Sequence, residues 1–349
     1  MKTQQFNQTH RISLVGQRKT MPQLNEPLTF SPILKQIIWG GRRLGERLGK
    51  PIGDGADYAE SWEFVDRTAD QSIVDQGPLA GKSVAELIAT HAHELLGRHL
   101  QSKSFPLLLK YLDCNRVLSV QVHPGNEYAM KMNPPDLGKT EAWYIVEAIP
   151  NSVIYAGLKA GVDRTALASA VRAGRTEEVL HSLKPEAGQC IFIPAGTVHA
   201  LGDGLLVAEV QQSSDTTFRL FDWNRVGADG KPRPLHIEQS LDVTDYDRGP
   251  IVPQTPIQQA DGWELLVKCD KFALRRGKSN ASADRELTTG GKDSPVILMV
   301  TTGAAMIEGF GWEPRRVRAG QTVLLPTSLG STSIRLIGSS TNVLEVTLP

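Results

Sequence analysis

Four residues of the kinds that bind metal ions lie on or beside segments with the alternating pattern of β-strands. Gln121 and His123 are two residues apart in SVQVHP, so their side chains share one face of a strand. Glu141 shares the polar face of GKTEAWYI with Lys139, and His199 follows the turn in IPAGTVH. Two imidazoles and a carboxylate are ligands that zinc accepts, and Gln121 adds a neutral oxygen. If the strands close into one barrel with these faces inward, the four side chains converge on one divalent cation.

The same four residues are also compatible with an ordinary protein surface. Their separations of 2, 18 and 58 residues are too irregular to be diagnostic of a metal site. Two further charged residues follow the same alternation: Glu209 shares a face with Gln211 in LLVAEVQQ, and Arg219 shares a face with Thr217 and Phe221 farther along.

The elements that must position these side chains are short strands. The runs SVIYAG, CIFIPAG, LLVAEV, VILMVTTG and TVLLP are rich in β-branched residues and are separated by glycine and proline. This pattern is typical of an all-β sandwich or barrel. Helical periodicity occurs at about 82–103 and 161–183, which we expect to be helical insertions. The predicted fold class is mainly β.

A proline-rich stretch, RGPIVPQTP at 248–256, predicts a domain boundary. We expect one domain over 27–250, which carries the candidate metal ligands, and a smaller β domain over 257–349. AGQCIFIP begins at Ala187 and AGQTVLLP begins at Ala319, which indicates two versions of one β module. No histidine follows His236, so the second module is expected to lack metal ligands.

Residues 1–26 are predicted to form a flexible leader. The first 20 residues contain four basic and no acidic side chains, and they lack the continuous apolar core of a secretory signal. A cleaved targeting segment is the alternative. No apolar run in the chain reaches the length of a membrane span.

The charge balance excludes some classes of partner. Lysine plus arginine equals aspartate plus glutamate at 38 each, so no overall positive field attracts nucleic acid or an anionic membrane. A small, locally charged ligand fits better. The three cysteines, Cys114, Cys190 and Cys269, are far apart and lie in apolar surroundings. They indicate free thiols in a reducing, cytoplasmic compartment rather than a disulfide framework.

At this point the motifs resemble a known family. GQCIFIPAGTVH fits the second motif of the cupin superfamily, whose four fixed positions are Gly188, Pro194, Gly196 and His199. The first cupin motif is altered, because Gln121 replaces its first histidine and the acidic residue comes only at Glu141. That departure resembles type I mannose-6-phosphate isomerases of the short bacterial form. FPLLLKYLD, SVQVHP, GKTEAWYI, EVQQSSDTTFRLFDWNR and RPLHIEQSL extend the resemblance over about 27–245.

The resemblance implies a cupin-type jelly-roll barrel that binds one zinc ion per chain, followed by a degenerate cupin-like domain. The zinc ligands it implies are Gln121, His123, Glu141 and His199. It also implies interconversion of mannose 6-phosphate and fructose 6-phosphate by proton transfer through an enediol. The other site residues it implies are Arg219 and Glu209 as catalytic residues and Lys110, Ser119 and Lys139 as substrate-binding residues.

Several alternatives stay open. Arginine remains protonated, so Arg219 suits charge stabilisation better than proton transfer. Glu209 is the candidate base, but it could equally be a buried structural carboxylate paired with a lysine, and hydroxide at the metal is a further candidate. Lys110, Lys139 and Ser119 are the candidates to bind the phosphate. The competing functions are a metal-binding sugar sensor without catalysis and an iron dioxygenase. The expected partner is a sugar phosphate, and the expected state is a monomer or weak homodimer.

Overall fold

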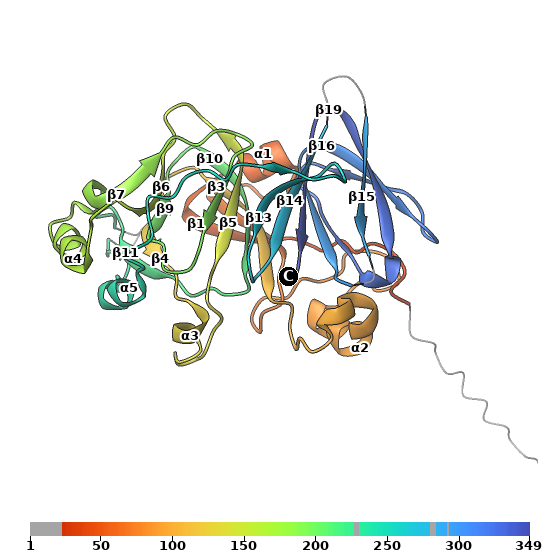
Figure 1. Ribbon diagram of the computed structural model, residues 1–349, viewed down its shortest axis with the longest axis horizontal. Coiled ribbons are helices and arrows are strands. Elements are labelled where there is room, and N and C mark those ends of the chain that lie inside the picture. The colour runs from red at the N-terminus through yellow and green to blue at the C-terminus, as the bar shows by residue number, and fades with distance from the viewer. Residues whose placement is uncertain (1–22, 227–229, 280–283, 292) are drawn as a thin grey trace, which may run out of the picture.

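Two antiparallel sheets that face each other form the part of the molecule that carries the candidate residues (Figure 1). The computed structural model describes residues 23–226, 230–279, 284–291 and 293–349. The six-stranded sheet has the order β1 (Ile33–Gly41), β2 (Tyr58–Phe64), β3 (Leu107–Cys114), β10 (Leu205–Gln212), β5 (Glu141–Ala148) and β8 (Cys190–Ile193). The five-stranded sheet has the order β11 (Phe218–Phe221), β4 (Val120–Val122), β9 (His199–Leu201), β6 (Ile154–Leu158) and β7 (Leu180–Leu183). The mainly β fold predicted from the sequence is confirmed.

Alternation along the central strands decides what each face of the six-stranded sheet contacts. In β5, Trp143 and Ile145 point inward and pack with residues of the other sheet, whereas Tyr144 points outward into a different core. In β10, Val207 packs inward and Ala208 packs outward in the same way. The space between the sheets is therefore part apolar core and part cavity, and the cavity holds the polar inward positions.

A third sheet covers the outward face of the six-stranded sheet (Figure 1). It consists of β12 (Ile257–Gln258), β13 (Glu264–Lys268), β14 (Ala273–Lys278), β15 (Arg285–Gly290), β16 (Val296–Gly309), β17 (Arg315–Arg318), β18 (Thr322–Leu325) and β19 (Ser331–Thr347). Its Leu274 and Met299, with Phe272 just before β14, share one apolar core with Leu109 and Tyr111 of β3. The predicted division into two domains thus falls between sheets that share a core, and it stays a prediction.

The helices lie outside the barrel (Figure 1). They are α1 (Arg43–Leu48), α2 (Val84–Leu96), α3 (Asn126–Ala129), α4 (Arg164–Arg172) and α5 (Ile237–Val243), with short 3-10 turns at Gly97–His99, Thr176–Val179 and Thr327–Leu329. A capping box starts α2: the Ser83 hydroxyl accepts a hydrogen bond from the Glu86 N–H, and the Glu86 carboxylate accepts one from the Ser83 N–H. α4 and α5 pack on the outer face of the five-stranded sheet.

The structure corrects two details of the sequence analysis. The second predicted insertion ends in strand β7, because Leu180–Leu183 pairs with β6. A register shift in β11 turns Phe221 away from Arg219 and into the core beneath α5. Residues 1–22 of the predicted leader lie outside the described residues; in the remainder Leu24 is buried and Glu26 forms an ion pair with Arg315, and the flexible leader stays a prediction.

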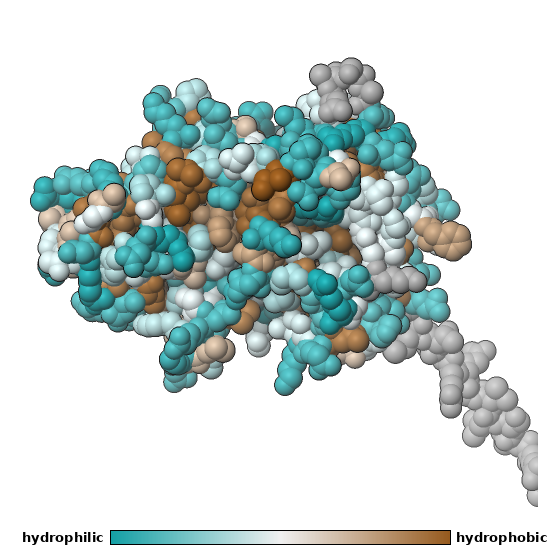
Figure 2. Space-filling model, in the orientation of Figure 1, coloured by the Kyte–Doolittle hydropathy of each residue, from teal (hydrophilic) through white to brown (hydrophobic). Residues whose placement is uncertain are grey.

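Hydrophilic residues cover much of the face shown in Figure 2, and smaller apolar areas interrupt them. Within the described residues, no helix is both long enough and apolar enough to cross a membrane.

Candidate active site

His123, Glu141 and His199 form a buried cluster between the two sheets. Each offers one ligand atom, and these atoms all lie within 4.8 Å of one another. Nε2 of His123 is 3.6 Å from Glu141 Oε2, and Nε2 of His199 is 3.4 Å from Glu141 Oε1. The three residues are at most 1 % exposed. The three side chains meet because β4 and β9 are neighbours in one sheet and β5 begins at Glu141 in the sheet that faces them.

Both imidazoles are held with Nε2 toward the centre of the cluster. Nδ1 of His123 is 2.9 Å from the carbonyl oxygen of Thr216, and Nδ1 of His199 is 2.8 Å from that of Thr197. A carbonyl only accepts hydrogen bonds, so each Nδ1 carries the proton and each Nε2 keeps its lone pair. Backbone carbonyls orient metal-bound histidines in this way.

Burial keeps the two histidines neutral. It lowers the pKa of His199 to about 4, and burial together with the nearby Lys139 ammonium lowers the pKa of His123 well below its usual value. Within the described part of the chain, Glu141 Oε2 and His199 Nε2 make no hydrogen bond. Buried polar atoms without hydrogen bonds are uncommon, and a bound cation would satisfy these two. The donor set therefore fits a divalent metal ion.

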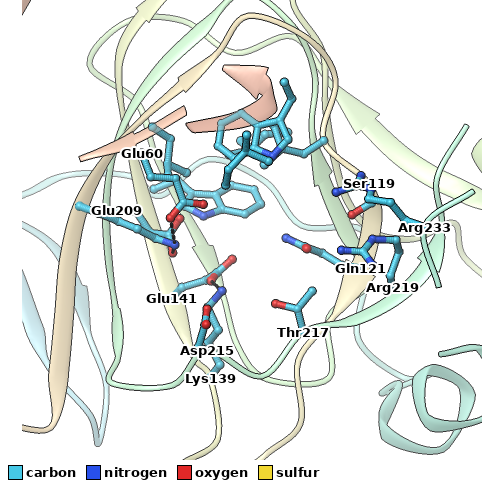
Figure 3. Close-up of a pocket in the computed structure, with 17 residues that line it drawn as sticks. Glu60, Ser119, Gln121, Lys139, Glu141, Glu209, Asp215, Thr217, Arg219 and Arg233 are labelled. Carbon is cyan, nitrogen blue, oxygen red and sulfur yellow. Dashed lines mark hydrogen bonds and ion pairs between the residues drawn. The ribbon is translucent and has the colours of Figure 1, made fainter. Parts of the chain in front are cut away.

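Gln121 stands beside the cluster. Its strand position pairs with His199 on one side and with Arg219 on the other. Its side chain points into the cavity, as Figure 3 shows. The structure thus brings all four predicted ligands to one place, three of them in direct contact range and Gln121 next to them.

Lys139 already occupies the edge of the cluster. Its Nζ is 3.1 Å from His123 Nε2 and 3.2 Å from Glu141 Oε2. The ammonium group therefore offsets the charge of the buried carboxylate.

A cavity of about 370 Å³ opens from the cluster and is lined by both sheets (Figure 3). Its charged and polar lining residues are Glu60, Lys110, Ser119, Gln121, Lys139, Glu141, Glu209, Asp215, Thr217, Arg219 and Arg233. A volume of this size suits a small organic molecule.

Lys110 bridges two carboxylates in the wall of this cavity. Its Nζ lies 3.3 Å from Glu60 Oε2 and 3.4 Å from Glu209 Oε1. Burial alone would lower the pKa of Lys110, but the carboxylates of Glu209 and Glu60 outweigh it and raise the pKa. Burial raises the pKa of Glu209 to about 7 despite the opposing charge of Lys110. For Glu60, the Lys110 charge and a hydrogen bond from Trp62 outweigh burial and lower the pKa.

Arg219 is fixed at another side of the cavity. Its Nη1 donates to the carbonyl oxygen of Pro234 at 3.0 Å, and its backbone pairs with that of His236. The pKa of Arg219 is lowered by burial and by the neighbouring charge of Arg233. Within the described residues, the buried Arg219 Nε has no hydrogen-bond partner.

The sequence analysis missed Glu60 and Arg233 as lining residues. Glu60 stands in the strand YAESWEF, but Glu63 in the same strand is also acidic, so the sequence does not single out Glu60. Arg233 follows a loop, and no pattern in the sequence distinguishes it from the other arginines nearby.

Comparisons with known proteins agree with this geometry. The model of the catalytic domain of type I phosphomannose isomerases matches residues 28–142. Mannose-6-phosphate isomerase ManA of Bacillus subtilis is 36% identical over 310 residues, covering 87% of this chain and 94% of that protein. The mannose-6-phosphate isomerase of Streptococcus mutans is 34% identical over 315 residues, covering 88% of this chain and 94% of its own.

A solved structure extends the likeness to three dimensions. The crystal structure of the mannose 6-phosphate isomerase from Bacillus subtilis matches with a TM-score of 0.82 and 28% identity, and the match covers 92% of this chain and 99% of that one. The relatives, the matching catalytic-domain model and the buried His–Glu–His cluster agree, and the chain belongs to the type I phosphomannose isomerase family.

Proposed function

We propose that this protein interconverts mannose 6-phosphate and fructose 6-phosphate with one zinc ion per chain. The observation that carries the proposal is the buried cluster of His123, Glu141 and His199 at the wall of a cavity lined by charges of both signs. Gln121 completes the ligand set. Two neutral imidazoles and one carboxylate favour a borderline cation such as zinc. Bound zinc would supply positive charge beside the sugar oxygens and orient them.

The reaction moves one proton between C2 and C1. Glu209 takes the proton from C2 of the open-chain aldose, and the electron pair of that C–H bond forms the double bond of an enediol as the C1 oxygen gains a proton. Return of the proton to C1 and loss of the proton from the C2 oxygen give the ketose. Atoms and electrons balance without an oxidant or reductant.

Glu209 has the surroundings that a base requires. Glu209 lines the cavity, and its buried Oε1, 3.4 Å from Lys110 Nζ, makes no hydrogen bond within the described part of the chain. A base works best when its pKa lies near the working pH, and burial brings Glu209 there. The ion pair with Lys110 holds the carboxylate in place without removing its capacity to accept a proton.

The remaining cationic side chains contact the substrate. Arg219 stabilises negative charge that develops on the enediol oxygens, because its guanidinium stays protonated and its Nε is unpaired. Lys110, Lys139 and Ser119 bind the sugar phosphate from the cavity wall. We also place the protein in a reducing compartment, which its three free cysteines support.

A coupled assay with mannose 6-phosphate tests the proposal. We expect turnover by the zinc-loaded protein, loss of turnover with a chelator and recovery when zinc is restored. Metal analysis of the purified protein accompanies the assay. Absence of turnover in zinc-loaded protein would favour a sugar sensor, and bound iron with oxygen consumption would favour a dioxygenase.

A further inference from the structure

The two buried histidines of the metal cluster are oriented by different kinds of partner. Nδ1 of His199 donates to the carbonyl oxygen of Thr197, only 2 residues away, so the turn that leads into β9 fixes this ring by itself. Nδ1 of His123 donates to the carbonyl oxygen of Thr216, which is 93 residues away in the chain. The orientation of His123 therefore depends on the contacts that hold Thr216.

Thr216 lies in the segment 213–217, which connects β10 with β11 and stands outside both strands. Three donors of this segment reach one oxygen atom, Oδ2 of Asp136. The Thr216 hydroxyl lies 2.8 Å from this oxygen, the Ser214 hydroxyl 3.1 Å and the Asp215 amide nitrogen 3.3 Å. The Ser214 hydroxyl also accepts a hydrogen bond from the Thr216 N–H at 3.2 Å, which closes a small ring of hydrogen bonds around Thr216.

A carboxylate can hold this segment only if it is fixed itself, and Arg67 fixes it. Asp136 Oδ1 accepts hydrogen bonds from Arg67 Nη1 at 3.1 Å and from the Leu137 N–H at 2.8 Å. The same Arg67 Nη1 donates to the carbonyl oxygen of Ser213 at 2.7 Å, so one guanidinium group contacts both the carboxylate and the segment that the carboxylate binds. Burial alone would raise the pKa of Asp136, but hydrogen bonds from Arg67 and Thr216 outweigh it and lower the pKa. Asp136 is therefore ionised at neutral pH and has acceptor sites for all of these donors.

Asp136 is also close in the chain to a second residue of the cluster. Glu141 begins β5 after a short connection that contains Lys139. The Lys139 N–H donates to the carbonyl oxygen of Pro124 at 3.0 Å, so this connection is tied to the residue that follows His123. Asp136 thus joins the segment before Glu141 to the segment that orients His123.

We propose that Asp136 is a positioning residue for metal binding: it fixes Thr216, whose carbonyl oxygen holds the His123 ring with Nε2 toward the cluster. This inference rests on the proposed function for the identity of the metal, but not for the orientation of the ring. It assigns Asp136 no contact with the substrate or the metal. Removal of the groups that orient metal-bound histidines weakens metal binding about 10- to 100-fold.

The first test uses the metal-free protein and NMR of its nitrogen-labelled histidine rings. In wild-type protein the Nδ1 protons of His123 and His199 should both be protected from exchange with water, because both are buried and hydrogen-bonded. Asp136→Ala should speed up the exchange of the His123 proton at least about tenfold, because the carbonyl group that accepts it is no longer held. The His199 proton should not change. A role of Asp136 in overall stability alone would speed up both, and His123→Gln and His199→Gln assign the two signals.

The second test measures the affinity for zinc by competition with a chelator of known strength. We expect Asp136→Ala to bind zinc at least about tenfold more weakly than wild type. Asp136→Asn keeps one oxygen that can accept from the Thr216 hydroxyl, so it should recover part of the lost affinity. The matched control is Asp261→Ala, since Asp261 also accepts hydrogen bonds from an arginine and from a backbone N–H but lies between β12 and β13. This control should bind zinc as wild type does.

Turnover of mannose 6-phosphate separates this inference from the proposed function. If Asp136→Ala keeps the zinc affinity of wild type within about twofold and the His123 proton stays protected, the inference is wrong. If Asp136→Ala weakens zinc binding and exposes the His123 proton while wild-type protein shows no turnover, the proposed reaction fails and the inference stands. Should Asp136→Ala not fold, as circular dichroism would show, Thr216→Val carries the same comparison, because valine lacks the hydroxyl that donates to Asp136.

Discussion

Burial is the main reason why the pKa of the Glu209 carboxylate is raised. Its carboxylate lies in β10 opposite Lys110 of β3, so it is enclosed by the sheet yet faces the cavity. The position in the strand, and therefore the inward direction, is readable from LLVAEVQQ. The ion pair with Lys110 is not, because it depends on which strand β10 pairs with.

Replacing Glu209 by glutamine tests its role as the base. Glutamine keeps the size of the side chain but accepts no proton at neutral pH. We expect the exchange of the C2 proton with solvent to fall at least about 100-fold while one zinc ion per chain remains bound. Exchange is measured by NMR in deuterium oxide, and metal content by elemental analysis. Retained exchange would remove Glu209 from the mechanism.

The candidate site residues could be identified in the sequence only where they stand in a short motif. Gln121, His123 and His199 stand in compact patterns, and Glu141 shares a face with Lys139 two positions away. Glu60 and Arg233 have no such neighbours in the sequence. They reach the cavity because β2 pairs with β3 and because the segment around Pro234 pairs with Arg219. Both pairings belong to the tertiary structure and cannot be read from the local sequence.

At the scale of elements, Asp222 joins strand β11 to the loop that follows it. Burial alone would raise the pKa of Asp222, but the hydrogen bonds from Arg233 and Arg225 outweigh burial and hold the pKa below its usual value of 3.8. The ionised carboxylate therefore contributes stability above pH 3.8, and this contribution is lost as the pH falls through the lower pKa of the folded state.

Asp222→Asn should remove that contribution. At pH 7 we expect the free energy of unfolding to fall by about 2 kcal/mol, because two partly buried guanidinium groups lose a charged acceptor. The difference from wild type should shrink as the pH falls below 3.8. Urea unfolding followed by circular dichroism at pH 7 and at pH 3 measures both. An equal difference at the two pH values would contradict the assigned ionisation.

The elements themselves were partly predictable. Strand β10 has apolar alternation long enough to recognise, and α2 has both its helical periodicity and its capping box in the sequence. Strand β7 was mistaken for helix because its four residues follow directly on a helical pattern. It is a strand because β6 pairs with it, which local sequence does not encode.

At the scale of the whole molecule, the third sheet is a support for the active site. The face of β3, β5 and β10 that points away from the cavity packs against Phe272 and its neighbours in one continuous core. The sequence indicated a second β module but not that its core is shared. We therefore expect both parts to unfold together.

Phe272→Ala tests this dependence. Phe272 is fully buried in the shared core, so its truncation should lower the free energy of unfolding by about 4 kcal/mol. Unfolding should remain one transition when followed both by zinc release and by circular dichroism. The control is Phe310→Ala, because Phe310 is 97% exposed and its loss should cost less than about 0.5 kcal/mol. Release of zinc at a separate midpoint would show that the two parts are independent.

Strand β10 pairs along its length with β3 on one side and with β5 on the other, so its amide groups are held in hydrogen bonds on both edges. In deuterated solvent, these amides should be among the last to exchange, since they open only when the sheet opens. The backbone beneath Glu209 then stays still while the enzyme works. In the proposed reaction, the motion that carries a proton between two carbons of the sugar is then left to the carboxylate end of the Glu209 side chain and to the sugar itself.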